Sequence, residues 1–98
     1  MITFDDINRT LHNHLEELRQ TFGVAEIGVF GSFVRGEQRE DSDVDILVVL
    51  SRPVGFVAFV RLEERLRTLL GRNVDLVSKK ALKPYIGRRI LEEVRYVS

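Results

Sequence analysis

Two aspartates stand on either side of one valine at the start of the most apolar segment of the chain. Asp43 and Asp45 flank Val44, and aliphatic residues fill positions 46–50. Residues i and i+2 of a β-strand point to the same face, so both carboxylates would project to one side. Carboxylates this close repel each other unless a cation lies between them, and Mg²⁺ takes oxygen ligands of this kind. The pair therefore predicts a divalent-metal site.

A third aspartate interrupts another apolar segment. Asp75 lies between Val74 and Leu76, in a run typical of a strand. On a neighbouring strand it would complete a two-metal site, in which two Mg²⁺ ions ~3.5–4 Å apart hold the attacking and leaving oxygens of a phosphoryl transfer. Asp75 alone could instead form a salt bridge with Arg72 or with a C-terminal arginine. Asp45 is harder to explain structurally, because an acid in a buried strand is costly unless it is paired or metal-bound.

A Gly-Ser pair follows the first apolar strand directly. Gly31 lets the backbone approach a ligand closely, N–H groups at a turn point at anions, and the Ser32 hydroxyl adds a donor. These groups suit phosphate oxygens. By itself, however, a Gly-Ser pair is most often an ordinary turn.

Hydrophobic periodicity predicts the elements that position these residues. Period-3.6 patterns indicate three helices, with Gly23 and Gly71 as stops of the first two and Pro84 in the first turn of the third. Apolar, β-branched runs indicate three strands. The expected helices span 5–22, 56–70 and 82–94, and the expected strands span 24–30, 43–50 and 73–77. This order predicts an α+β fold, sandwich-like, with a small mixed β-sheet packed by helices.

Composition limits the class of protein. The chain has 98 residues, 44% of them apolar and 31% charged, which fits one small domain, residues 1–98. It has no cysteine, which excludes disulfides, thiolate zinc sites and a cysteine nucleophile. The zero net charge argues against direct nucleic-acid binding. No apolar stretch approaches the ~20 residues of a membrane span, and no signal peptide is visible, so we expect a cytoplasmic protein without a membrane partner.

Taken together, these motifs resemble those of a known family. Gly31-Ser32, ten further residues and Asp43-Val44-Asp45 are similar to the signature of the DNA polymerase beta-like nucleotidyltransferases. The fuller runs at 31–37 and 42–48 resemble the minimal nucleotidyltransferase (MNT) subfamily, and the run at 73–77 resembles its third acidic strand. The resemblance covers about residues 5–95. It implies the DNA polymerase beta-like nucleotidyltransferase fold, with helices against one face of the sheet.

The resemblance also implies roles for the acidic residues. Asp43 and Asp45 would bind two Mg²⁺ ions, while Asp75 would complete one metal site and help to deprotonate the acceptor hydroxyl. All three are therefore expected to be both metal ligands and catalytic residues.

The nucleotide, with ATP as donor, would be held by the other motif. Ser32 and the backbone of Gly31 would bind the β- and γ-phosphates. Arg35 would lie near the phosphates, or would form a salt bridge to Glu37 or Asp41, and the sequence leaves both readings open.

In relatives of this size, the resemblance implies a HEPN-type toxin as partner. The MNT protein is then the antitoxin, and it transfers AMP from ATP to a tyrosine of the toxin. The chain is also too short to add an acceptor-binding domain. We therefore expect a partner or a second copy to supply the acceptor-binding side of the site.

Two regions are candidate contacts for the partner: the apolar start of the second long helix at 56–60, and the basic segment 78–98. The alternative for the apolar start is a wide buried helix face. Two alternative functions also remain: a non-enzymatic antitoxin that neutralises its partner by contact, and transfer to a small-molecule alcohol.

Overall fold

The computed structural model describes residues 2–97, which build a mixed four-stranded sheet in the order β3-β2-β1-β4. The strands are β1 (Val24–Phe30), β2 (Val44–Leu50), β3 (Val74–Ser78) and β4 (Arg95–Tyr96). β1 is antiparallel to β2 and to β4, whereas β2 and β3 are parallel. The α+β class and the small mixed sheet expected from the sequence are confirmed.

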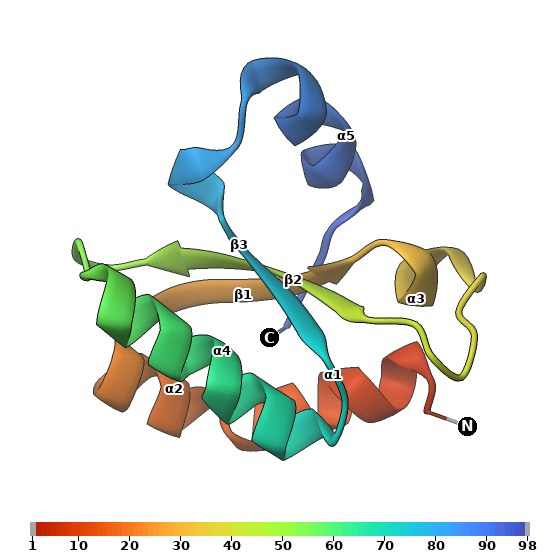
Figure 1. The fold of residues 1–98 in the computed structure, drawn as a ribbon, viewed down its shortest axis with the longest axis horizontal. Coiled ribbons are helices and arrows are strands. Elements are labelled where there is room, and N and C mark those ends of the chain that lie inside the picture. The colour runs from red at the N-terminus through yellow and green to blue at the C-terminus, as the bar shows by residue number, and fades with distance from the viewer. Residues whose placement is uncertain (1, 98) are drawn as a thin grey trace.

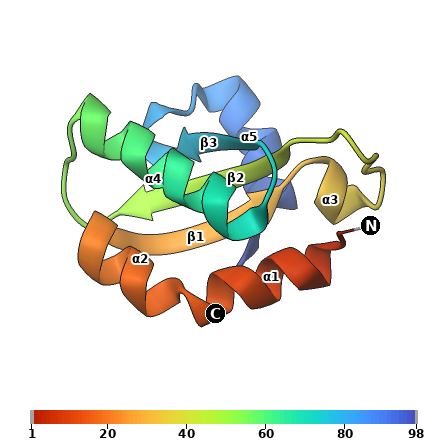
Figure 2. The same ribbon diagram turned by 60° about the horizontal axis from the view of Figure 1, so that its bottom comes forward.

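Helices pack on both faces of this sheet. α1 (Phe4–Asn13), α2 (Leu15–Phe22) and α4 (Phe56–Leu70) cover one face, while η1 (Lys79–Ala81) and α5 (Pro84–Glu93) lie on the other (Figures 1 and 2). The short α3 (Ser32–Arg35) follows β1. The expectation of helices on one face is therefore wrong for α5. The chain must cross the sheet from β3 at one edge to β4 at the other, and three helices already fill the opposite face.

The core lies between the sheet and the three helices on the first face. Leu11, Leu18, Leu62 and Leu66 from these helices are completely or almost completely buried against alternate residues of β1 and β2. Leu47, which alternates with those core residues of β2, is also fully buried. The expected burial of β2 on both faces is thus confirmed.

The expected first helix is broken in the middle. The helix 5–22 divides at His14, which has φ −111° and ψ 10° and separates α1 from α2. The Nδ1 atom of His14 lies 2.9 Å from the carbonyl oxygen of Thr10, which a continuous helix would use for its own backbone bond. The start is as expected, because Thr3 and Asp6 form a capping box.

The other predicted elements agree with the structure to within two residues, and Pro84 is the first residue of α5. Strand β4 was not predicted, because two exposed residues carry no alternation that could reveal a strand. Among residues 2–97, no helix is both long and apolar enough to cross a membrane.

Candidate functional site

The register of the sheet places two of the three predicted acids side by side. Asp45 on β2 pairs with Asp75 on β3, and Phe30 pairs with Asp45 on the other side. Residues paired in this way project to the same face of the sheet. Asp43 immediately precedes β2. Asp43 and Asp75 are exposed and Asp45 is half-buried. Asp45 lines a cavity together with residues of α5, so Asp45 and its pairing partner Asp75 lie on the face of the sheet that carries α5.

The charge of Asp45 is poorly compensated. Burial and, after it, the negative charges of Asp75 and Asp43 together raise the pKa of this carboxyl to about 6, while Arg35 offsets only part of this effect. Burial and the two negative charges disfavour the ionised carboxylate, whereas a bound cation would favour it. The electrostatics are therefore those of a cation site.

The donor chemistry fits Mg²⁺, since the three side chains supply hard carboxylate oxygens near one point of the sheet. Within residues 2–97, however, no three His, Cys, Asp or Glu side chains are grouped so that they could hold a metal ion. The residues thus fit the metal by chemical type and by the unrelieved charge of Asp45, but their side chains are not grouped as a complete set of ligands. The oxygens of a nucleotide are natural candidates for the ligands that the protein does not supply.

Gly31 packs directly against Asp45. Its φ of +81° is strained for any residue with a side chain, and a Cβ atom placed there would lie 2.0 Å from Oδ2 of Asp45. The turn is closed by the N–H groups of Val34 and Arg35, which donate to the carbonyl of Gly31 at 3.1 and 3.2 Å. The Gly-Ser turn and the acidic strand therefore form one compact unit.

We predict that Gly31→Ala abolishes nucleotide binding and lowers stability more than Gly36→Ala does. Gly36 has a similar φ of +73° but open space around its missing side chain, so its substitution costs only backbone strain, about 1–2 kcal/mol. At Gly31 the methyl group must also displace the Asp45 carboxylate. Urea unfolding and nucleotide titration of both variants test this. Equal effects in the two variants would show that the close contact with Asp45 has no consequence.

The groups predicted to hold phosphate already bind a carboxylate. The N–H of Gly31 donates to Oε2 of Glu93 at 2.8 Å, and Nη1 of Arg35 donates to Oε1 of Glu93 at 2.6 Å. Arg35 also forms the expected salt bridge to Glu37, at 3.1 Å, and its Glu93 partner raises its pKa more than Glu37 does. Ser32 is half-buried beside them.

The loop before β2 is organised by an arginine that the sequence did not single out for this role. Nη2 of Arg72 donates to the backbone carbonyls of Arg39, Glu40 and Ser42, and its guanidinium lies 5.3 Å from the centre of the Phe33 ring. The Ser42 hydroxyl accepts a hydrogen bond from the backbone N–H of Arg39 at 2.8 Å. Arg72 therefore orders the loop that leads to Asp43. The alternative Arg72–Asp75 salt bridge is absent from the described residues.

A cavity of about 350 Å³ opens between this end of the sheet and α5. The sheet side contributes Gly31, Arg35 and Asp45, and α5 contributes apolar residues, one arginine and one glutamate. The lining residues are Phe30, Gly31, Arg35, Asp45, Tyr85, Ile86, Arg89, Ile90 and Glu93. Of the predicted site residues, the cavity brings together Asp45, Gly31 and Arg35, whereas its lining does not include Asp43, Asp75 or Ser32.

Comparison with known proteins identifies the family of the chain. Residues 11–97 match the nucleotidyltransferase domain family. The chain is 54% identical over 97 residues to the protein adenylyltransferase MntA of Thermococcus cleftensis, covering 99% of this chain and 98% of that protein. The chain therefore belongs to the nucleotidyltransferase domain family and is an enzyme of that class.

Solved structures show the same fold. A minimal nucleotidyltransferase superposes with a TM-score of 0.80 at 34% identity, covering 96% of this chain and 95% of that one. A toxin–antitoxin structure with AMP-PNP gives 0.74 at 24% identity, covering 89% and 72%. The complex of a tri-AMPylated Shewanella oneidensis HEPN toxin with its MNT antitoxin gives 0.67 at 19% identity, covering 93% and 71%. The last two similarities establish a shared fold.

Proposed function

We propose that this protein is a Mg²⁺-dependent protein adenylyltransferase, which transfers AMP from ATP to a hydroxyl of a partner protein. The observation that supports this proposal most directly concerns Asp45, which pairs with Asp75 on β3 and packs against Gly31. Asp45 and Gly31 line one cavity together with Arg35. The named activity of the MntA relative and the AMPylated toxin in the related complex support the choice of AMP and of a protein acceptor.

In this proposal, each motif has a separate task. Asp43, Asp45 and Asp75 would hold two Mg²⁺ ions, whose chemistry would be to neutralise charge on the phosphates. Ser32 and the N–H of Gly31 hold the β- and γ-phosphates, and Arg35 adds a positive charge beside them. Asp75, which is exposed and pairs with Asp45, accepts the proton of the acceptor hydroxyl as the oxygen attacks the α-phosphorus and pyrophosphate leaves.

ATP binding should require a divalent metal. Without metal, the three acids repel the triphosphate. Mg²⁺ that arrives with ATP would instead take oxygen ligands from both the carboxylates and the phosphates. Calorimetry should show weak Mg–ATP binding that is lost in EDTA and in Asp43→Asn. Asp41→Asn is the matched control, because Asp41 is an exposed acid of the same loop outside the predicted ligand set. Tight ATP binding in EDTA would contradict this account of the site.

The proposed partner is a HEPN-type toxin, with the present protein as its antitoxin. Five exposed basic residues lie on η1, on α5 or between them, on the same side of the sheet as the acids: Lys79, Lys80, Lys83, Arg88 and Arg89. A positive surface of this kind favours an acidic partner surface and speeds association. An ATP-dependent modification of such a toxin also fits the expected cytoplasmic location.

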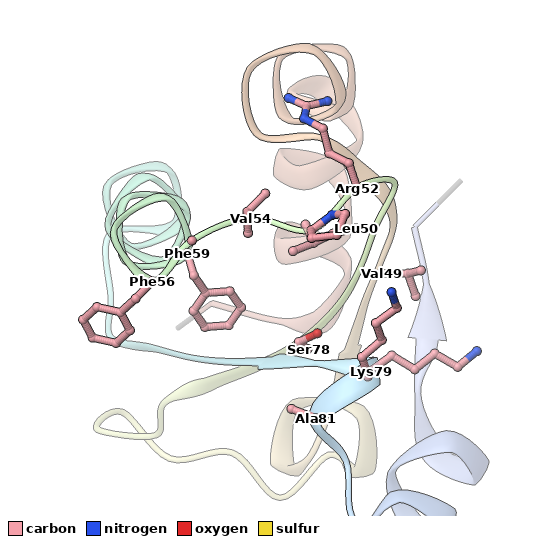
Figure 3. Close-up of a pocket in the computed structure, with 12 residues that line it drawn as sticks. Val49, Leu50, Arg52, Val54, Phe56, Phe59, Ser78, Lys79 and Ala81 are labelled. Atoms are coloured by element: carbon pink, nitrogen blue, oxygen red, sulfur yellow. The ribbon is translucent and has the colours of Figure 1, made fainter.

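The apolar start of α4 is the second proposed contact. Phe56 and Val57 are 81% and 64% exposed, so the alternative of a fully buried helix face is wrong for these two residues. Figure 3 shows Phe56 and Phe59 projecting from α4 on one side of a pocket of about 580 Å³, with Lys79 and Ala81 on the other. Exposed aromatic rings beside an apolar pocket are typical of a protein-binding surface.

A further inference from the structure

Glu93 is the only acidic side chain of α5 that lines the nucleotide cavity, and the sequence motifs give it no role. Its two carboxylate oxygens bind two different donors: Oε2 accepts from the N–H of Gly31 at 2.8 Å, and Oε1 accepts from Nη1 of Arg35 at 2.6 Å. These are two of the groups that the proposed function assigns to the phosphates of ATP. In this structure, an anion of the protein itself therefore occupies the phosphate-binding groups.

This contact is better defined than an ordinary surface salt bridge. The Glu93 side chain is 23% exposed, whereas Glu37, the other partner of Arg35, is 64% exposed. Glu93 is the last residue of α5, and the strand that follows it, β4, pairs with β1 at Gly28 and Val29, close to Gly31. The backbone thus holds Glu93 above the Gly-Ser turn.

The electrostatics favour the ionised carboxylate in this position. Burial alone would raise the pKa of Glu93, but the hydrogen bonds from Arg35 and from the Gly31 N–H outweigh it, and the pKa is lowered. Charge-assisted hydrogen bonds of this type are among the stronger ones in proteins. At neutral pH, Glu93 is therefore a charged competitor for any other anion.

A triphosphate and Glu93 cannot use these donors together. The backbone N–H of Gly31 carries one hydrogen, and a carboxylate left in contact with bound phosphates would repel them. Glu93 also contributes to the negative potential at Asp45. Nucleotide binding must then include the separation of Glu93 from Gly31 and Arg35.

We propose that Glu93 is a built-in competitor of the triphosphate, which closes the phosphate-binding groups in the nucleotide-free protein and is displaced when nucleotide binds. This inference rests on the proposed function for the identity of the ligand. In this role, Glu93 lowers the affinity for nucleotide. Because Glu93 is the last residue of α5, nucleotide binding would also change the contacts at the end of this helix.

The test compares the binding of Mg–tripolyphosphate by the wild-type protein, Glu93→Gln and Glu92→Gln. Tripolyphosphate has no base and no adenylyl group, so its affinity reports only on the phosphate-binding groups. Glu93→Gln should bind it about fivefold to tenfold more tightly, because the competing charge is removed while the side chain keeps its size. Glu92→Gln removes an exposed neighbouring charge and should bind like the wild type. Equal or weaker binding by Glu93→Gln, or no binding by any of the three proteins, overturns the proposal.

A second test uses only the wild-type protein, so its result does not depend on the folding of a variant. Titration with Mg–tripolyphosphate, followed by NMR of the Glu93 side-chain carboxyl carbon and the Gly31 amide, should shift both signals together as the contact breaks. Binding without a change at Glu93 overturns the proposal. The proposed function fails separately: if Glu93→Gln gains affinity but no protein transfers AMP from ATP, the competitor role stands and the enzymatic assignment does not.

Discussion

Asp45→Asn is expected to abolish adenylyl transfer and, in the absence of metal, to stabilise the fold. The same carboxylate has two effects. It is the proposed ligand shared by both metal ions, so its loss should reduce transfer by at least about 100-fold, the lower end of effects seen when a catalytic group is removed. Without metal it is a half-buried charge whose pKa is raised to about 6 by burial first, and then by the negative charges of Asp75 and Asp43.

The stabilisation should depend on pH in a defined direction. The folded-state pKa of about 6 lies above the ordinary value of 3.8, so between these values the folded protein binds more protons than the unfolded chain. The stability of the wild-type protein therefore falls as pH rises through this window, and the full cost is present above about pH 6. Asp45→Asn removes this cost. Its advantage should be absent below about pH 4 and complete at pH 7–8.

The expected size is modest because solvent screens a half-buried group. About 1 kcal/mol at pH 8 corresponds to a rise in melting temperature of about 4–8 °C for a domain of this size. Melting curves in EDTA at pH 4 and pH 8 measure it, with Asp41→Asn as the control for loss of a solvated charge. Mg²⁺ with ATP should narrow the gap by stabilising only the wild-type protein. A large fall in melting temperature in Asp45→Asn would show that Asp45 has a structural partner instead.

The sequence revealed those parts of the site that depend on local patterns. Asp43 and Asp45 were recognisable from their spacing within one strand, and Asp75 from its apolar neighbours, because alternation along a strand is a property of adjacent residues. The prediction of one metal site already assumed that β2 and β3 are neighbouring strands. The register that sets Asp45 beside Asp75 required the folded sheet.

The groups that the sequence did not reveal act over long distances along the chain. Glu93 contacts Gly31 across 62 positions, and Arg72 contacts the carbonyl of Ser42 across 30. Neither belongs to a motif, since an acid at the end of one helix and an arginine after another are ordinary on any surface. Their roles arise only when β4 closes against β1 and the turn before β3 packs against the loop before β2. Such contacts depend on topology, which local patterns do not define.

Asp75→Asn is expected to separate catalysis from association with the partner. Asp75 is exposed next to Asp45 and is the proposed acceptor of the hydroxyl proton, so the amide variant should lower transfer by about 100-fold or more. The affinity for the partner should change by no more than about fivefold, because an exposed charge contributes at most about 1 kcal/mol. Incubation with ATP, Mg²⁺ and the proposed HEPN-type partner, followed by mass spectrometry of that partner, measures transfer. Calorimetry measures the affinity.

Phe56→Glu should give the opposite result, with the complex weakened about tenfold or more and ATP binding unchanged. Phe56 is 81% exposed beside the apolar pocket, at the end of β2 remote from Asp45, and burial of such an aromatic ring often dominates an interface. Thr68→Glu, an exposed position near the other end of α4, introduces the same charge outside the proposed contact and should bind the partner normally.

Two outcomes would contradict these predictions. If Asp75→Asn neutralises the partner as well as the wild type does, and neither protein increases the mass of the partner, neutralisation occurs by contact and the proposal of a protein acceptor is wrong. If Phe56→Glu binds the partner like Thr68→Glu, the acceptor docks elsewhere, and the basic side chains of η1 and α5 become the remaining proposed contact.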